Sequence, residues 1–486
     1  MWRLVTDGSD RTTCRTYAAL DGAGGISLDR KLLLSLAVGF LGLGTLSLAL
    51  PSALSYDPWS WIVWGREVVA GDLNTARAVS WKPLPVLFTT PFSLFGDLAP
   101  DLWLLVARAA AFGAIAAAAS VGFRLAGRVG AVLSAGLLLS GAWFWGPALT
   151  GGSEGALVLC VLAAVDRHLA GHHAQALGLW VTGALLRPEV WPFLGLYAGW
   201  LVIHSPARAR WVIPGLALVP ALWLLPELWG SGELWRGAER ARQFLSEGSP
   251  GLAERPAVAV LDRAAALTPA VTFLGLLAGT ATVVLRKAPR RTLAPALGLA
   301  SFGTLWLALV AVMSELGFSG NDRYLLMSVA VATVLGGVGL AWAIVALLSA
   351  GGGRFVGTVL ATCLAGLALV LVVRSVRWDW PPLIEFVERH SAVTRDLDVA
   401  IDRAGGKRRL EACGGIYASN LLTPPVAWTF HRHLEQVQVV PEAPGVVLRA
   451  RLLLNQPLDP PNTALRGEWK IVARSRYWEV QAACSS

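Results

Sequence analysis

Charged residues are scarce in this chain of 486 residues, because Asp, Glu, Lys and Arg together make up only 15% of it. Soluble globular proteins carry roughly 25% charged residues, so an ordinary soluble fold is excluded for most of the chain. Cysteine is rare as well. The five cysteines include no CxxC pair, which excludes zinc and redox sites of the usual spacing. Residues 1–31 also lack the apolar stretch and cleavage site of a signal peptide, so the first apolar run is expected to be a retained span.

Long apolar runs take the place of charge. Hydrophobic residues make up 55% of the chain, and its mean hydropathy is +0.56. The runs recur at lengths of about 20 residues, which is what a helix needs to cross the hydrocarbon core of a bilayer. The sequence therefore predicts a polytopic α-helical membrane domain over residues 32–376, with about eleven spans.

The basic residues indicate how these spans are oriented. The formal net charge of +9 comes from short Lys and Arg clusters between apolar runs, and every cluster falls on one side of the predicted topology. This is the positive-inside pattern of a membrane protein, and it argues against nucleic-acid binding. We expect residues 1–31 to be cytoplasmic and the turns TGGSEG, RPE and NDRY to lie outside. The abundance of Ala, Gly, Arg and Leu favours a bacterial inner (plasma) membrane.

The character of the chain changes near residue 377. Residues 377–486 are rich in charge and proline, with short runs such as GVVLRARLLL and WKIVARSRYWEV that are typical of strands. We predict a small extracytoplasmic α/β domain that is large enough to fold alone. Cys413 and Cys484 lie in it, and either pair in an oxidising compartment or remain two free thiols.

Residues 55–100 stand apart from the apolar runs around them. Their mixture of proline, aromatic and charged residues predicts interfacial helices against the membrane. A charged, aromatic-rich loop beside a span is where polar chemistry at a bilayer surface would be done. The residues that give the loop this character are Asp57, Arg66, Glu67, Asp72, Lys82, Trp59, Trp61, Trp64 and Trp81.

Two charges in this loop are candidates for chemistry. Asp57 could accept a proton from an acceptor hydroxyl as a general base, or it could be a carboxylate that caps a helix. Lys82 could hold a phosphate as a compact cation, or it could extend to lipid headgroups.

Other charges lie at the outer turns or inside a span. Arg187 and Glu189 flank one proline and could simply pair with each other, while Asp322 and Arg323 could form a local surface pair. Arg108 lies several residues inside a span and needs an interior partner, which favours a structural ion pair over substrate contact. The outer-turn charges are Glu154, Arg187, Glu189, Asp322 and Arg323.

The loop has a recognisable motif. It reads D-x8-R-E-x3-G-D over residues 57–72 and W-K-P-L-P over residues 81–85. This resembles the first outer loop of the GT-C membrane glycosyltransferases, and most of all the branch with protein O-mannosyltransferases and lipid A aminoarabinose transferases. The later features Ser153-Glu154, RPE at 187–189 and Arg323-Tyr324 fit the same branch. The resemblance covers about residues 32–350 as architecture.

The resemblance implies a GT-C-like transferase that uses a polyprenyl-phosphate-linked sugar on the outer face of the membrane. Asp57 would be the general base and Lys82 would hold the donor phosphate, helped by Arg187 or by Arg323 and Tyr324. Arg66, Glu67 and Asp72 are expected to hold the shape of the loop. The acceptor, which could be a glycan, a protein or a lipid, stays open.

Two departures from the family pattern concern a metal. The acidic residue that follows the first one in the family is Pro58 here, and the residue before the lysine, acidic in some relatives, is Trp81. Both changes weaken the case for a divalent metal, so no obligatory metal or other cofactor is expected.

Two other functions compete with glycosyl transfer. A transporter or flippase of a lipid-linked sugar would show broken or charged helices at mid-membrane in both halves of an inverted repeat. Only Arg108 and the break at 187–189 are candidates for such features, and the second half of the chain has no match. A non-catalytic scaffold that presents the outer domain would not depend on Asp57.

Overall fold

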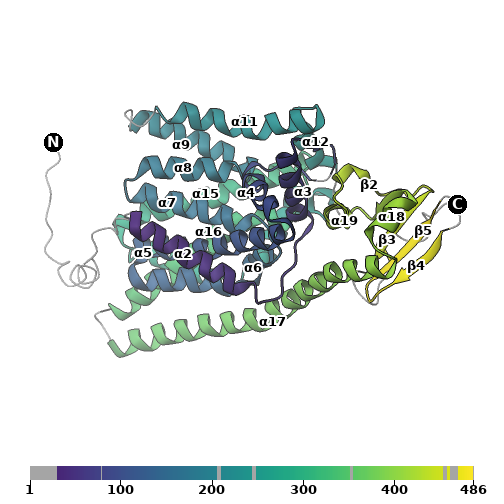
Figure 1. Cartoon of the computed structure of the whole chain (residues 1–486). Helices are drawn as coiled ribbons and strands as arrows, with labels where there is room; N and C mark the ends of the chain where they lie inside the picture. The colour runs from purple at the N-terminus through teal and green to yellow at the C-terminus, as the bar shows by residue number, and fades with distance from the viewer. Residues whose placement is uncertain are drawn as a thin grey trace.

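The computed structural model describes residues 30–77, 79–204, 210–243, 248–350, 354–451, 457–459 and 469–484. The segment predicted to be cytoplasmic, residues 1–31, lies outside these ranges except for its last two residues. Long helices run side by side in a bundle, and a small domain with a β-sheet sits at one end of it (Figure 1). We call this the domain end of the bundle.

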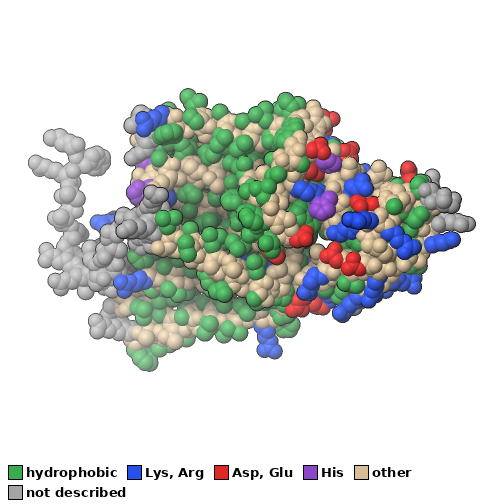
Figure 2. Space-filling view, in the orientation of Figure 1, with side chains coloured by type: hydrophobic (Ala, Val, Ile, Leu, Met, Phe, Trp, Pro, Cys, Tyr) green, Lys and Arg blue, Asp and Glu red, His purple; other side chains and the backbone are tan. Residues whose placement is uncertain are grey.

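The bundle contains helices of very different length. Its members are α2 (Arg30–Ser47), α5 (Ala99–Ser140), α6 (Ala142–Leu149), α7 (Glu154–Leu169), α8 (His173–Ala184), α9 (Trp191–His204), α11 (Val212–Ser231), α13 (Pro256–Leu267), α14 (Ala270–Val284), α15 (Arg290–Glu315), α16 (Asp322–Leu348) and the first part of α17 (Arg354–Arg403). Hydrophobic side chains cover much of the middle of the visible face, while charged side chains concentrate towards its two ends (Figure 2). The chain is a multi-pass membrane protein.

The predicted count of eleven spans is not confirmed. Among the described residues, five helices are long and apolar enough to cross a membrane, or seven if each of two bent helix pairs counts as one span. Part of the difference arises in α5, where two helices meet at a kink at Ala126 and Gly127 (φ 64° at Gly127) and count together as one element. Several predicted spans are short helices, such as α8 with 12 residues.

Helix α16 lies at the centre of the bundle and is buried along most of its length. Its contact with α14 depends on glycine, because a Cβ atom on Gly339 would clash with the carbonyl oxygen of Gly275. Small residues at such positions allow two helix backbones to approach closely, which is how helices pack where apolar burial alone gives no driving force.

The loop at residues 55–100 forms helices, as predicted: α3 (Tyr56–Ala70), α4 (Pro83–Phe92) and the 3-10 helix η1 (Ser93–Leu98). An interfacial loop would expose its tryptophans to the membrane surface, but the tryptophans of this loop are buried. Trp59, Trp61, Trp64 and Trp81 expose only 7%, 1%, 0% and 4% of their surface. They pack the loop against the bundle, as the edge-to-face contact of Trp61 with Trp103 at 5.5 Å illustrates.

The domain at residues 377–486 begins inside a helix. Helix α17 runs without interruption across the expected boundary at residue 376 and into the domain (Figure 1). The domain continues with α18 (Lys407–Cys413), β1 (Gly415–Ala418), α19 (Thr423–Thr429), η4 (Leu434–Gln436), β2 (Val437–Gln438), β3 (Gly445–Ala450), β4 (Lys470–Arg474) and β5 (Trp478–Ala483).

The domain has an α/β fold around one mixed sheet with strand order β2-β1-β3-β5-β4. Strand β1 is parallel to β2 and β3, whereas β5 pairs antiparallel with β3 and β4. Cys413 and Cys484 form a disulfide that connects α18 to the end of β5.

Arg108 is fully buried in α5, and its hydrogen-bond partners are backbone carbonyls and the Ser52 hydroxyl rather than a carboxylate. Its guanidinium donates to the carbonyl oxygens of Ser47 at 2.5 Å, Pro51 at 3.1 Å and Leu149 at 3.3 Å. Ser47 and Leu149 are the last residues of α2 and α6, where carbonyls have no partner within the helix. Arg108 therefore ties two helix ends together, in place of the ion pair that we expected.

We predict that Arg108→Met lowers the melting temperature of the protein in detergent, because three carbonyl oxygens and the Ser52 hydroxyl lose their hydrogen bonds to the guanidinium. The expected loss is about 3 kcal/mol in the free energy of unfolding. Arg128→Met is the matched control, since Arg128 is exposed on the same helix. Equal melting temperatures for the two variants would contradict this role.

Candidate active site

Asp57 lies at the domain end of the bundle, in the first turn of α3. Ser55 is the N-cap of this helix, so Asp57 does not take the capping position itself. A carboxylate in the first turn is still favoured by the partial positive charge of the helix N-terminus. The local sequence thus holds Asp57 at a helix start that faces the turns between the other helices.

The two predicted cations Lys82 and Arg187 share one local cause for their positions. Each precedes a proline, which disfavours helical backbone at the residue before it. Both are accordingly extended, with φ/ψ of −133°/113° for Lys82 and −149°/133° for Arg187. Each is also the N-cap of the helix that follows, α4 for Lys82 and η2 (Pro188–Val190) for Arg187. A cation there opposes the helix dipole, so helix stability does not explain either residue.

Two of the predicted residues, Arg323 and Lys82, meet at the carboxylate of Asp57. Arg323 Nη1 lies 2.5 Å from Asp57 Oδ2, and Lys82 Nζ lies 3.9 Å from the same oxygen. Lys82 Nζ is also 3.5 Å from Ser153 Oγ and lies over the ring of Trp61 at 4.9 Å. The ammonium group is therefore enclosed between a carboxylate, a hydroxyl and an aromatic face.

Two further carboxylates, those of Glu154 and Glu189, lie beside Arg187. Its Nη2 atom lies 2.6 Å from Glu154 Oε1, and its Nη1 atom lies 3.6 Å from Glu189 Oε1. The expected pairing within the RPE turn thus exists, but Glu154 is the closer partner. Tyr324 links the two groups, because the guanidinium carbons of Arg187 and Arg323 lie 4.8 Å and 5.4 Å from its ring centre.

Burial and charge act in opposite directions on Asp57. Burial alone would raise the pKa of its carboxyl, but the positive charges of Arg323, Lys82 and Arg187 outweigh it and hold that pKa below its usual value. For Lys82, burial and the nearby Arg187 lower the pKa of the ammonium group to about 8, although Asp57 opposes this shift. The site thus favours the ionised form of the Asp57 carboxyl, beside a lysine whose pKa lies below its usual value.

A cavity of about 290 Å³ opens onto this cluster. Asp57, Glu154 and Arg323 line it together with Tyr56 and Trp61, and the α17 residues Leu383 and Phe386 form an apolar wall. Lys82 and Arg187 are not in its lining. Their side chains expose 11% and 3% of their surface, against 39% for Arg323, so Arg323 is the cation of this set that a ligand meets first.

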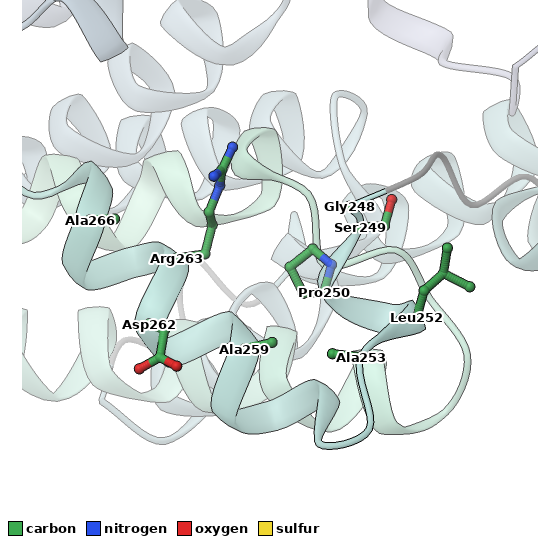
Figure 3. Close-up of a pocket in the computed structure, with 9 residues that line it drawn as sticks. All are labelled: Gly248, Ser249, Pro250, Leu252, Ala253, Ala259, Asp262, Arg263 and Ala266. Carbon is green, nitrogen blue, oxygen red and sulfur yellow. The ribbon is translucent and has the colours of Figure 1, made fainter.

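A larger hollow of about 490 Å³ lies between the 3-10 helix η3 (Pro250–Leu252) and α13 (Figure 3). Its lining is mostly small or apolar, with Asp262 and Arg263 as its charged members. Arg263 Nε lies 2.5 Å from the carboxylate of Asp322. The local pair of Asp322 with Arg323 that the sequence left open therefore does not form. Asp322 instead pairs with Arg263, which lines the larger hollow and not the cavity beside Asp57.

The remaining motif residues contact the C-terminal domain instead of the cavity. Arg66 donates to the carbonyl oxygens of Arg432 at 2.7 Å and Trp428 at 3.3 Å. The ring of His433 lies between two carboxylates, with Nδ1 at 2.9 Å from Glu67 and Nε2 at 3.0 Å from Asp72. Burial raises the pKa of Glu67 to about 7. We expected these residues to shape the loop, and they also fasten the domain to it.

Neither sequence families nor curated proteins match this chain, whereas solved structures do. The crystal structure of ArnT from Cupriavidus metallidurans bound to undecaprenyl phosphate matches with a TM-score of 0.58 and 14% identity. The same protein in the apo state gives a TM-score of 0.59, also at 14% identity. Each match covers 93% of this chain and 97% of the other.

The chain has the fold of ArnT. ArnT is a lipid A aminoarabinose transferase of the GT-C superfamily, the branch that the first-loop motif resembles. The 7% of this chain outside the match is much shorter than residues 377–486, so the likeness extends into the C-terminal domain. This corrects the range of about 32–350 that the sequence motif suggested.

Sequence reasoning missed several residues around the cluster. Leu383 and Phe386 looked like part of a separate soluble domain, and only the continuity of α17 brings them to the cavity. Glu227 is buried in α11 and accepts a hydrogen bond from the backbone N–H of Trp81 at 3.1 Å. The available signal was an acidic residue inside an apolar run, which usually marks a specific partner.

We predict that Arg66→Ala loosens the contact between α3 and the C-terminal domain. Two hydrogen bonds from a charged donor are lost, so amide hydrogen exchange at residues 428–433 should become about tenfold faster. Arg389→Ala removes an exposed pair with Glu385 on α17 and should leave this exchange unchanged. Unaltered exchange in the Arg66 variant would show that the contact does not hold the domain.

Proposed function

We propose that this protein is a membrane glycosyltransferase that moves a sugar from a polyprenyl-phosphate donor to an acceptor hydroxyl. The observation that carries the proposal is the cluster in which Asp57 contacts Arg323 and Lys82 beside a cavity, in a chain with the ArnT fold. The ArnT neighbour was solved with undecaprenyl phosphate bound, which supports a lipid-linked phosphate as the donor class.

In the proposed reaction, the acceptor oxygen attacks the anomeric carbon of the donor sugar. Asp57 takes the proton of the acceptor hydroxyl, and the bond between the anomeric carbon and the phosphate oxygen breaks. The electron pair of that bond leaves with the polyprenyl phosphate. Because the leaving group is a phosphate, it needs cations rather than a proton donor, and Arg323, Lys82 and Arg187 would supply them.

The charges of the cluster balance before any donor binds. Asp57, Glu154 and Glu189 carry three negative charges, while Lys82, Arg187 and Arg323 carry three positive charges. A donor phosphate therefore competes with Asp57 for Arg323, the cation that lines the cavity. Once Arg323 turns to the phosphate, Asp57 loses its strongest partner, and its carboxylate becomes the better base that the acceptor requires.

The sidedness of the reaction follows from the charge pattern of the sequence. The turns with Glu154, Arg187 and Arg323 meet at the domain end of the bundle, and the basic clusters lie between the other helix ends. We place the domain end outside the membrane, with the N-terminus in the cytoplasm. We propose no obligatory metal for this chemistry, because Pro58 replaces the second acidic residue of the family motif and the nearby carboxylates already have cationic partners.

The first test is Asp57→Asn in the purified protein, assayed with polyprenyl-phosphate sugars and a panel of acceptors. Without its base, transfer should fall by about two to four orders of magnitude. Binding of undecaprenyl phosphate should become tighter, since the anion that competes for Arg323 is gone. Asp322→Asn is the matched control, because it removes an exposed carboxylate one residue from Arg323.

Unchanged transfer in Asp57→Asn would contradict the role of Asp57 as base. Weaker phosphate binding in the same variant would contradict the competition for Arg323. A flippase would be favoured if the wild type moves the lipid across the membrane but transfers no sugar, and if Asp57→Asn loses that movement.

The second test is the pH dependence of kcat/KM for the donor, which reports groups in the free enzyme. Lys82 binds phosphate as a cation, and its pKa is about 8, so kcat/KM should decline as pH rises through this value. Lys82→Arg should move the decline to higher pH, since a guanidinium stays charged. A decline at the same pH in both proteins would assign it to another group.

A further inference from the structure

A buried carboxylate outside the cavity has no part in the reaction described so far. Glu227 lies near the end of α11 and exposes 3% of its surface. Its Oε1 atom accepts the backbone N–H of Trp81 at 3.1 Å, and the side chains of Thr75 and Arg236 also interact with this carboxylate. Burying a carboxylate is costly unless it makes a strong contact, so this placement needs an explanation.

The peptide that Glu227 holds is the one directly before Lys82. The indole Nε1 of Trp81 also donates to the carbonyl oxygen of Leu222 on α11 at 3.0 Å, so backbone and side chain of Trp81 are fixed to one helix. On the other side of Lys82, the N–H of Leu84 donates to the carbonyl oxygen of Leu185 at 3.2 Å. Lys82 is thus presented between two anchored residues.

The segment before Trp81 is fixed to the same region. The N–H of Thr75 donates to the carbonyl oxygen of Gly230 at 3.1 Å, and Ser80 Oγ donates to that of Gly237 at 2.7 Å. Arg236 of α12 (Arg236–Gln243) donates to the carbonyl oxygen of Ala76. Helices α11 and α12 therefore hold residues 75–81. Among the hydrogen bonds described for this stretch, the one from the Trp81 N–H is accepted by a charged side chain, that of Glu227.

We propose that Glu227 is a positioning residue that holds the Trp81 peptide so that Lys82 reaches Asp57 and Ser153. An ionised carboxylate is a stronger hydrogen-bond acceptor than a neutral oxygen, which suits a peptide that must not rotate. If the Trp81 peptide turned, the extended backbone imposed by Pro83 would carry the ammonium group away from the cluster. The link to donor binding rests on the proposed function, whereas the placement of Lys82 does not.

The experiment compares Glu227→Leu with Glu227→Gln, which keeps an acceptor oxygen in the same place. The first readout is the rate at which an amine reagent modifies Lys82, measured by mass spectrometry across pH. In Glu227→Leu, Lys82 should leave its buried setting, so its modification profile should shift to higher pH than in the wild type. Glu227→Gln should restore most of the wild-type profile.

The second readout is kcat/KM for the donor, which should fall about tenfold in Glu227→Leu, the change expected for one lost buried hydrogen bond. Glu233→Leu is the matched control, because Glu233 is exposed just beyond α11. A folded Glu227→Leu protein with wild-type modification of Lys82 would overturn the proposal.

If Glu227→Leu is not recovered folded, Glu227→Met tests the same contact, because it removes the acceptor of the Trp81 N–H with a side chain of similar length. It should shift the modification profile of Lys82 in the same direction, and an unchanged profile would overturn the proposal. If the protein proves to have no transferase activity, the modification of Lys82 still decides the positioning role, so the two failures are distinguishable.

Discussion

The ion pair between Asp57 and Arg323 is the contact on which the site depends. It connects α3, the first helix of the loop at residues 55–100, to the start of α16, the helix at the centre of the bundle, over 266 residues of sequence. Taking such a pair out of water is costly, and the attraction compensates only with good geometry and further partners. Lys82 and the aromatic faces of Trp61 and Tyr324 provide these partners. The cavity lies where the ends of several helices bring these charged residues together.

The prolines after Lys82 and Arg187 show how local sequence produces this convergence. Each proline forces extended backbone on the cation before it, and each cation then stands at a helix start that a cation would normally destabilise. The sequence breaks this local rule twice, at two cations that belong to one cluster of charges, and so accepts a cost in stability for the arrangement of the site. The ArnT fold brings the two breaks together, although only 14% of the residues are identical.

Much of the cluster could be predicted because membrane proteins rarely place charge beside lipid without a reason. Asp57, Lys82 and Arg323 were singled out in this way, and the resemblance to the GT-C first loop suggested that they belong to one site. The partner of each charge could not be predicted, since it depends on helix rotation. Asp322 and Arg323 are neighbours in sequence, yet on α16 they contact different partners. The burial of the tryptophans could not be predicted for a related reason, because composition does not distinguish a lipid surface from a protein interior.

Helix α3 adds a connection that no single motif residue indicated. Its first turn carries Asp57, and its last turns carry Arg66 and Glu67, which contact the C-terminal domain roughly 15 Å further along the helix axis. Helix α17 makes the second connection, since the helix that enters the domain also lines the cavity with Leu383 and Phe386. The domain thus reaches the site through two rigid helices. A movement of the domain would therefore also move Asp57 and the apolar wall, which makes the domain part of the geometry of the site.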